Sequence, residues 1–201
     1  MKSLAIEREY GTGGWELGKR IAEAKGIPFY DELGIIKEAE KMGCKLSLLK
    51  NYEEKKKESI LYNIAAIANH KTELKIEVEK MIQELFEELK ETIEKLHDRE
   101  PAVFVGGAVC GIIDKSDDCL KVFLHSSRID TKIAYLHQHK GVLPNVEISR
   151  IMENKDKQRG IYFRMLTHKE WKNPENYNLT YDVSNITNEK IANIVCEIMD
   201  N

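Results

Sequence analysis

A glycine-rich segment near the start of the chain joins a short apolar run to an amphipathic pattern. The run at residues 4–6 is typical of a buried strand, and Leu17 and Ile21 repeat with the period of a helix. Between them lies Arg8-Glu9-Tyr10-Gly11-Thr12-Gly13-Gly14-Trp15-Glu16. Glycines at such a junction let the backbone turn tightly and point successive N–H groups at an anion, beside the positive end of the helix dipole. The segment therefore predicts a phosphate-binding loop, and a nucleotide is the first ligand hypothesis.

Short apolar runs alternate with helical patterns along the rest of the chain. The runs that we interpret as strands are residues 4–6, 28–30, 102–105, 120–124 and 179–183. Helical patterns separate them, at about residues 72–96, 150–166 and 189–199 among others. This alternation is typical of a parallel α/β sheet with helices on both faces. The broad apolar stripe at residues 78–96 favours a helix packed on the sheet over a coiled coil, and the charged run at 53–58 favours a solvated helix face or loop.

Length and charge limit the class of protein. The chain has 201 residues, enough for one domain with a sizeable core, and its net charge is −3. That charge gives no basic field to attract nucleic acid or an anionic membrane, so we expect neither as a partner. The four cysteines are scattered, which favours reduced thiols, and with no signal peptide at Met1 we expect a cytoplasmic protein. The sequence leaves the oligomeric state open.

Five weak motifs occur in one order along the chain. They are Arg8 to Gly14, Pro28-Phe29-Tyr30-Asp31, Phe104-Val105-Gly106, Asp156-Lys157-Gln158-Arg159 with Tyr162-Phe163, and Trp171 through Leu179. Together they resemble the cytidylate kinase-like proteins, a branch of the nucleoside monophosphate kinases within the P-loop NTPases. The resemblance implies a single-domain three-layer sandwich over residues 1–201, with a five-stranded parallel sheet and a helical lid at about 140–170. It also implies ATP on the glycine loop, magnesium, and phosphoryl transfer to a nucleoside monophosphate such as CMP.

The loop departs from an ordinary kinase loop, and two registers are possible. One takes Lys19 as the loop lysine, with Arg20 where Ser or Thr is expected. The other ends the loop at Gly14, which then replaces the lysine, while Glu16 replaces the magnesium-binding hydroxyl. The helical period favours the second register and places Lys19 about one turn inside the helix, unless its long stem reaches back to the phosphates.

Each of three side chains in or next to the loop has two possible roles. Arg8 follows the strand, where it either compensates for the lost lysine or pairs with Glu9 or Glu16. Trp15 either stacks on a base or packs beside the loop. Glu16 either holds magnesium through water or complements the helix dipole. We therefore expect nucleotide binding by Gly11, Thr12, Gly13, Gly14, Trp15 and Glu16, with Glu16 as the metal candidate.

The predicted acceptor side lacks the arginine that the resemblance implies. The family usually reads Gly-Arg after the third strand, whereas this chain has Gly106 and Gly107. We therefore expect weak CMP binding, improved by Gly107→Arg if the site has room and Gly107 does not need a positive φ. Asp31 and Arg128 follow other strands and are candidate acceptor-binding residues, because ligands bind at the carboxyl edge of such sheets.

The predicted lid carries the remaining catalytic candidates. Asp156 and Arg159 lie three residues apart and share a helix face, so Arg159 can swing onto the transferring phosphoryl while Asp156 holds it in the empty site. The alternative is a surface ion pair with little energetic effect. Trp171, Asn176 and Tyr177 either frame an adenine or fasten the last strand. Two other functions stay open: a nucleotide-binding protein without catalysis, and a kinase of a non-nucleotide small molecule.

Overall fold

The computed structural model describes residues 1–44, 76–113, 118–141 and 144–200; the charged run at 53–58 and the first residues of the helix predicted from 72 lie outside them. The elements of the first half are β1 (Ser3–Arg8), α1 (Gly14–Lys25), β2 (Phe29–Asp31), α2 (Glu32–Lys41) and α5 (Ile76–Arg99). Those of the second half are β3 (Val103–Val105), α6 (Val109–Ile112), β4 (Cys119–His125), α7 (Ile129–Lys140), α8 (Asn145–Thr167), the 3-10 turn η1 (Pro174–Asn176), β5 (Leu179–Asp182) and α9 (Asn188–Asp200).

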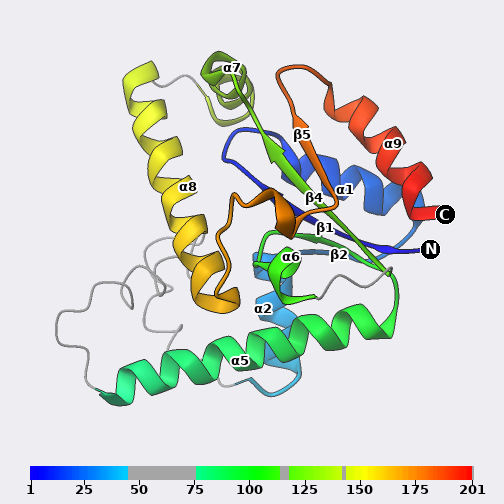
Figure 1. The fold of residues 1–201 in the computed structure, drawn as a ribbon, viewed down its shortest axis with the longest axis vertical. Coiled ribbons are helices and arrows are strands. Elements are labelled where there is room, and N and C mark those ends of the chain that lie inside the picture. The colour runs from blue at the N-terminus through cyan, green and yellow to red at the C-terminus, as the bar shows by residue number, and fades with distance from the viewer. Residues whose placement is uncertain (45–75, 114–117, 142–143, 201) are drawn as a thin grey trace.

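The five strands form one parallel sheet in the order β2-β3-β1-β4-β5. Strand β1 is central, with Leu4 aligned to Val103 of β3 on one side and to Leu120 of β4 on the other. All six residues of β1 are buried, as expected for a strand covered on both faces. The predicted five-stranded parallel sheet is confirmed, and the loops that follow its strands meet at one edge (Figure 1).

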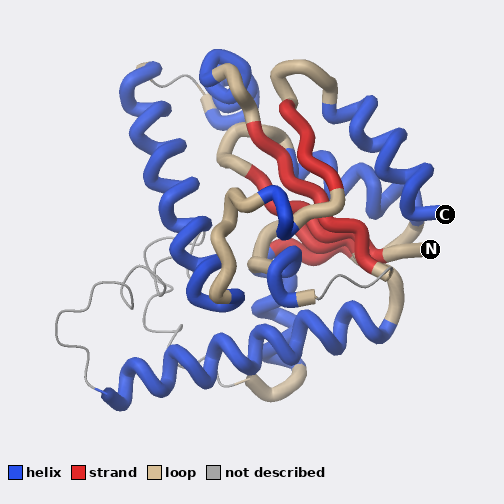
Figure 2. The backbone as a smooth tube through the Cα atoms, viewed as in Figure 1, coloured by secondary structure: helices blue, strands red, loops and turns tan. Residues whose placement is uncertain are grey.

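Helices lie on both sides of the sheet (Figure 2), and their apolar side chains form a buried layer on each face. Leu17 and Ile21 of α1 pack with Ile191 and Val195 of α9 on one face. Helices α2, α5, α6 and the end of α8 cover the other face, where the buried stripe of α5 comprises Leu85, Phe86, Leu89, Ile93 and Leu96. The prediction of a helix packed on the sheet is therefore confirmed for α5. None of the described helices is long and apolar enough to cross a lipid bilayer.

Helix α8 occupies most of the predicted lid segment, and its two ends have different surroundings. Ile148 and Met152 pack with Leu136 of α7 in a small cluster of their own. Tyr162 and Phe163, near the other end, are almost fully buried in the main core. The last turns of this helix are therefore part of the domain core, whereas its first turns lie over α7.

Candidate active site at the carboxyl edge of the sheet

The loop between β1 and α1 presents a row of backbone N–H groups. Helix α1 begins at Gly14, in agreement with the register that ends the loop there, and Gly11 and Gly13 adopt left-handed backbone conformations. In the described part of the chain, Glu9 N donates to Leu124 O and Leu17 N to Gly13 O, whereas the N–H groups of residues 11–16 donate to no protein acceptor. N–H groups without protein acceptors at a helix N-terminus are suited to a bound polyphosphate.

Arg8 lies at the end of β1 and points across the sheet edge. Its Nη1 is 3.6 Å from Oε1 of Glu32 in the first turn of α2, a partner that neither sequence-based alternative included. The side chain is largely buried and passes against Gly14 and Gly106. The guanidinium therefore lies between the loop after β1 and the turn after β3.

Trp15 packs beside the loop. Its indole Nε1 donates to Oδ2 of Asp31 at 2.9 Å, and its ring meets the edge of Phe29. Lys19 is the sixth residue of α1, and its Nζ lies 5.1 Å from the centre of the Trp15 ring. In this arrangement Lys19 contacts Trp15 on the exposed side of the helix.

Asp31 and Glu16 both have protein partners. Asp31 is the N-cap of α2, and its Oδ1 accepts from Gly34 N at 2.9 Å, so both of its carboxylate oxygens are used. Glu16 is exposed in the first turn of α1 and hydrogen-bonds with Tyr135 of α7. Burial, together with this bond to Glu16, raises the pKa of the Tyr135 hydroxyl. No group of three or more acidic, histidine or cysteine side chains suited to a metal occurs among the described residues.

The turn after β3 has a backbone that L-residues rarely adopt. Gly106, Gly107 and Ala108 have φ values of +77°, +71° and +60°. A Cβ at Gly107 would also lie 2.8 Å from Cδ1 of the buried Ile35. Both conditions that the Gly107→Arg rescue required are therefore absent, and arginine cannot be restored here without strain.

Asp156 and Arg159 of α8 contact the backbone of the loop. Oδ1 of Asp156 accepts from Tyr10 N at 2.7 Å, and Nη1 of Arg159 donates to the Arg8 carbonyl at 2.9 Å. The two side chains lie 3.8 Å apart, as their shared helix face predicts. Burial raises the pKa of Asp156, although Tyr10 N–H and the charges of Arg159 and Lys132 oppose it. In this conformation the pair holds the loop, so Arg159 would have to leave the Arg8 carbonyl to reach a phosphoryl group.

Glu9 anchors the loop from the side and was not predicted as a site residue. It accepts hydrogen bonds from Lys132 at 3.1 Å and from Lys172. Burial alone would raise the pKa of Glu9, but the two lysines outweigh it and hold the pKa below its ordinary value. Asn188 secures the other end of the loop, with Nδ2 donating to Thr12 O at 3.1 Å. These partners come from distant segments, which is why sequence patterns gave no signal for them.

Glu7 of β1 is a second residue that sequence reasoning missed. It is buried beneath Trp171, whose Nε1 donates to Oε2 of Glu7 at 3.1 Å. Burial raises the pKa of Glu7 to about 7, and the positive charge of Arg8 only partly offsets this. Trp171 and Tyr177 pack on Phe123 and fasten the last strand, in line with the packing alternative.

Arg128 lies at the other end of the carboxyl edge, as the N-cap residue of α7. Its backbone N–H donates to the hydroxyl oxygens of Ser126 and Ser184, at 3.3 and 3.2 Å. The residue is exposed and lies on the β5 side of β1, whereas Asp31 and Gly107 lie on the β2 side. The structure therefore does not bring the three predicted acceptor residues together.

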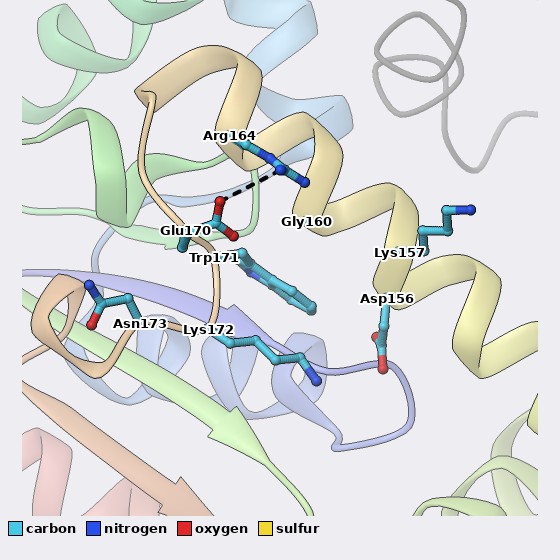
Figure 3. Close-up of a pocket in the computed structure, with 8 residues that line it drawn as sticks. All are labelled: Asp156, Lys157, Gly160, Arg164, Glu170, Trp171, Lys172 and Asn173. Carbon is cyan, nitrogen blue, oxygen red and sulfur yellow. Dashed lines mark ion pairs between the residues drawn. The ribbon is translucent and has the colours of Figure 1, made fainter. Parts of the chain in front are cut away.

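A cavity of about 620 Å³ opens between α8 and the segment that follows it. Figure 3 shows Asp156 and Lys157 of α8 on one side, with Trp171 and Lys172 on the other. Loop residues 11–14 do not line it. Asp156 and Lys172 nevertheless connect it to the loop, since they bind Tyr10 and Glu9.

The sheet order, the glycine loop before α1 and the helix that contacts it define the P-loop nucleotide kinase fold. More particularly, the chain belongs to the cytidylate kinase-like family, whose model matches residues 3–185. The resemblance inferred from the motifs is thereby confirmed. No curated protein matches the sequence.

Solved structures share this fold. An uncharacterized protein from Eubacterium ventriosum has a TM-score of 0.71 at 18% identity, over 99% of this chain and 98% of its own. A gluconokinase from Sinorhizobium meliloti has a TM-score of 0.50 at 17% identity, covering 99% and 91%. A shikimate kinase from Bacteroides thetaiotaomicron has a TM-score of 0.52 at 14% identity, covering 100% and 99%. At these identities the similarity establishes the fold.

Proposed function

We propose that this protein is a phosphotransferase that binds ATP on residues 11–16 and transfers the terminal phosphoryl to a small molecule beside the ends of β2 and β3. The proposal depends above all on the N–H groups of residues 11–16, which point from the start of α1 with no described protein acceptor. Membership of a kinase-like family supports it.

The loop at residues 11–16 and the carboxylate of Glu16 fit a bound complex of magnesium and a nucleotide. When bound, ATP supplies the phosphoryl group and magnesium neutralises charge on its oxygens. The N–H groups of the loop would hold the phosphates, and the exposed carboxylate of Glu16 would hold magnesium through water, which suits a cation that keeps several waters. Arg159 would exchange the Arg8 carbonyl for the transferring group.

The family name favours CMP as the acceptor. The turn at residues 106–108 favours a different acceptor, because it has no arginine side chain at the place where the family binds a monophosphate. The names of two structural neighbours, a gluconokinase and a shikimate kinase, support an acceptor that is a small molecule and not a nucleotide.

A second candidate function is nucleotide binding without turnover. It is favoured by Gly14 and Glu16, which stand where ordinary kinases carry a lysine and a hydroxyl. The loss of the lysine removes a charge-assisted hydrogen bond of roughly 1.5–3 kcal/mol.

Calorimetry and a coupled assay distinguish these functions. We expect ADP and ATP to bind weakly and to require magnesium, with inorganic tripolyphosphate competing for the same loop. Purified protein with ATP and magnesium is then tested against CMP, other nucleoside monophosphates, gluconate and shikimate. Turnover of any acceptor supports the kinase, and nucleotide binding without turnover across the panel supports the second function. Absence of nucleotide and tripolyphosphate binding would reject both.

A further inference from the structure

The loop has no lysine at residue 14, and the structure shows why a side chain there is excluded. A Cβ on Gly14 would lie 2.9 Å from Cγ and 3.1 Å from Cβ of Arg8. Leu124 closes a third side, at 3.2 Å. Arg8 and a lysine at residue 14 would therefore compete for the same space.

The guanidinium of Arg8 ends near the place that the loop lysine would serve. It passes over Gly14 at the start of α1, and Nη1 occupies the space of a Cβ on Gly106. The loop that would bind the donor lies on one side of it and the turn after β3, on the proposed acceptor side, lies on the other. The side chain is only 11% exposed, which keeps the charge in a partly dry setting where it acts more strongly than in water.

We infer that Arg8 replaces the loop lysine as the cation that binds the last two phosphates of the donor, on both sides of the bond broken in transfer, an inference that rests on the proposed function. In that transfer the bond from the terminal phosphorus to the bridging oxygen of ADP breaks as a bond to the acceptor oxygen forms, and the acceptor proton leaves to solvent. The planar fork of Arg8 binds phosphate oxygens with two N–H groups. Glu32 is the carboxylate that the phosphate oxygens displace, because it lies 3.6 Å from Nη1.

Three variants test the shared space of Arg8 and residue 14. Arg8→Ala should weaken ADP binding about 10- to 150-fold, which is the range for a lost charge-assisted hydrogen bond. Gly14→Lys alone should not improve affinity, because Arg8 leaves its side chain no room. The double variant Arg8→Gly/Gly14→Lys removes both Arg8 atoms that crowd residue 14 and should recover part of the loss. Arg20→Ala is the matched control, since Arg20 is an exposed arginine of α1 whose ion pair with Glu189 lies on the surface.

Glu32→Gln separates a phosphate-binding role from a structural ion pair. If Arg8 binds phosphate, a neutral partner should release the guanidinium more easily and raise ADP affinity about 5-fold. If Arg8 only stabilises the fold through Glu32, the variant should lose stability with no gain in affinity. This measurement decides the question even if Arg8→Ala fails to fold.

These measurements distinguish a failure of the Arg8 inference from a failure of the proposed function. A parent protein that binds neither ADP nor tripolyphosphate defeats the proposed function together with the role of Arg8. A parent that binds ADP while Arg8→Ala and Glu32→Gln leave the affinity unchanged overturns the Arg8 inference alone. Recovery in the double variant, with no effect of Arg20→Ala, supports it.

Discussion

Placing an arginine at residue 107 tests how the turn after β3 constrains the acceptor side. Gly107 has φ +71°, and a left-handed conformation costs an L-residue about 1–2 kcal/mol. The new Cβ would approach Cδ1 of Ile35 at 2.8 Å, and overpacking of a well-filled core costs roughly 1–3 kcal/mol. Gly107→Arg should therefore lose about 2–5 kcal/mol of stability, a large part of the roughly 5–15 kcal/mol that holds a domain together.

Gly26→Arg provides the matched control for this substitution. Gly26 also has a positive φ, +63°, but no atom lies within 4 Å of its added Cβ. It should lose only the backbone contribution of about 1–2 kcal/mol. At about 2–4 °C per kcal/mol for a chain of this size, the melting temperature should fall by about 4–20 °C for residue 107 and by about 2–8 °C for residue 26.

Circular dichroism gives the melting temperatures, and calorimetry gives CMP affinity for the same samples. We expect no gain in CMP affinity from Gly107→Arg, because a strained backbone will not hold the guanidinium in place. Equal melting temperatures for the two variants would refute the packing argument. Tight CMP binding by a stable Gly107→Arg protein would refute the whole line of reasoning.

Three further substitutions test the surroundings of the loop. Burial raises the pKa of Glu7 to about 7 from an ordinary 4.5, so the buried negative charge costs no stability below pH 4.5 and about 3 kcal/mol above pH 7. In urea denaturation, the stability of Glu7→Gln relative to the parent should therefore rise between pH 4.5 and pH 7. A stability difference that stays constant across this range would contradict the prediction. Asp31→Ala should lower the stability by about 0.5–2 kcal/mol, because it removes the N-cap of α2. It should also free the Trp15 indole, so that the fluorescence anisotropy of Trp15 falls. Unchanged anisotropy would show that Phe29 alone holds the ring. Arg159→Ala should lower phosphoryl transfer far more than ADP affinity, and equal losses would make Arg159 a ground-state binding residue.

The sheet and the order of its elements follow from local patterns. Apolar runs of strand length and helical periods of three to four residues are visible in any short window, so β1, α1 and α9 were predicted to within a few residues. The shared face of Asp156 and Arg159 is equally local, since it needs only the helical repeat. These predictions required no knowledge of which segments meet.

The partners of the candidate residues depend on the topology and were not predictable. Arg8 meets Glu32, and Asp156 meets the Tyr10 N–H from 146 residues away, because the sheet order brings these segments together. No pattern at Gly107 reveals its left-handed backbone. Asp31 is different, because an Asp directly before an acidic first turn is a helix N-cap signal that was available in the sequence.

The two environments of α8 have a mechanical consequence for the loop. Asp156 and Phe163 are seven residues apart, or roughly 10 Å along a helix that rises about 1.5 Å per residue. Asp156 bonds the loop backbone while Phe163 is clamped in the core, so the helix cannot rotate as one rigid rod without opening that core. Gly160 lies between them, and a glycine weakens a helix by about 1 kcal/mol relative to alanine. With the core intact, the loop is therefore released either by rotation of the Asp156 and Arg159 side chains or by a local bend of α8, and Gly160 is the weakest residue of this stretch for such a bend.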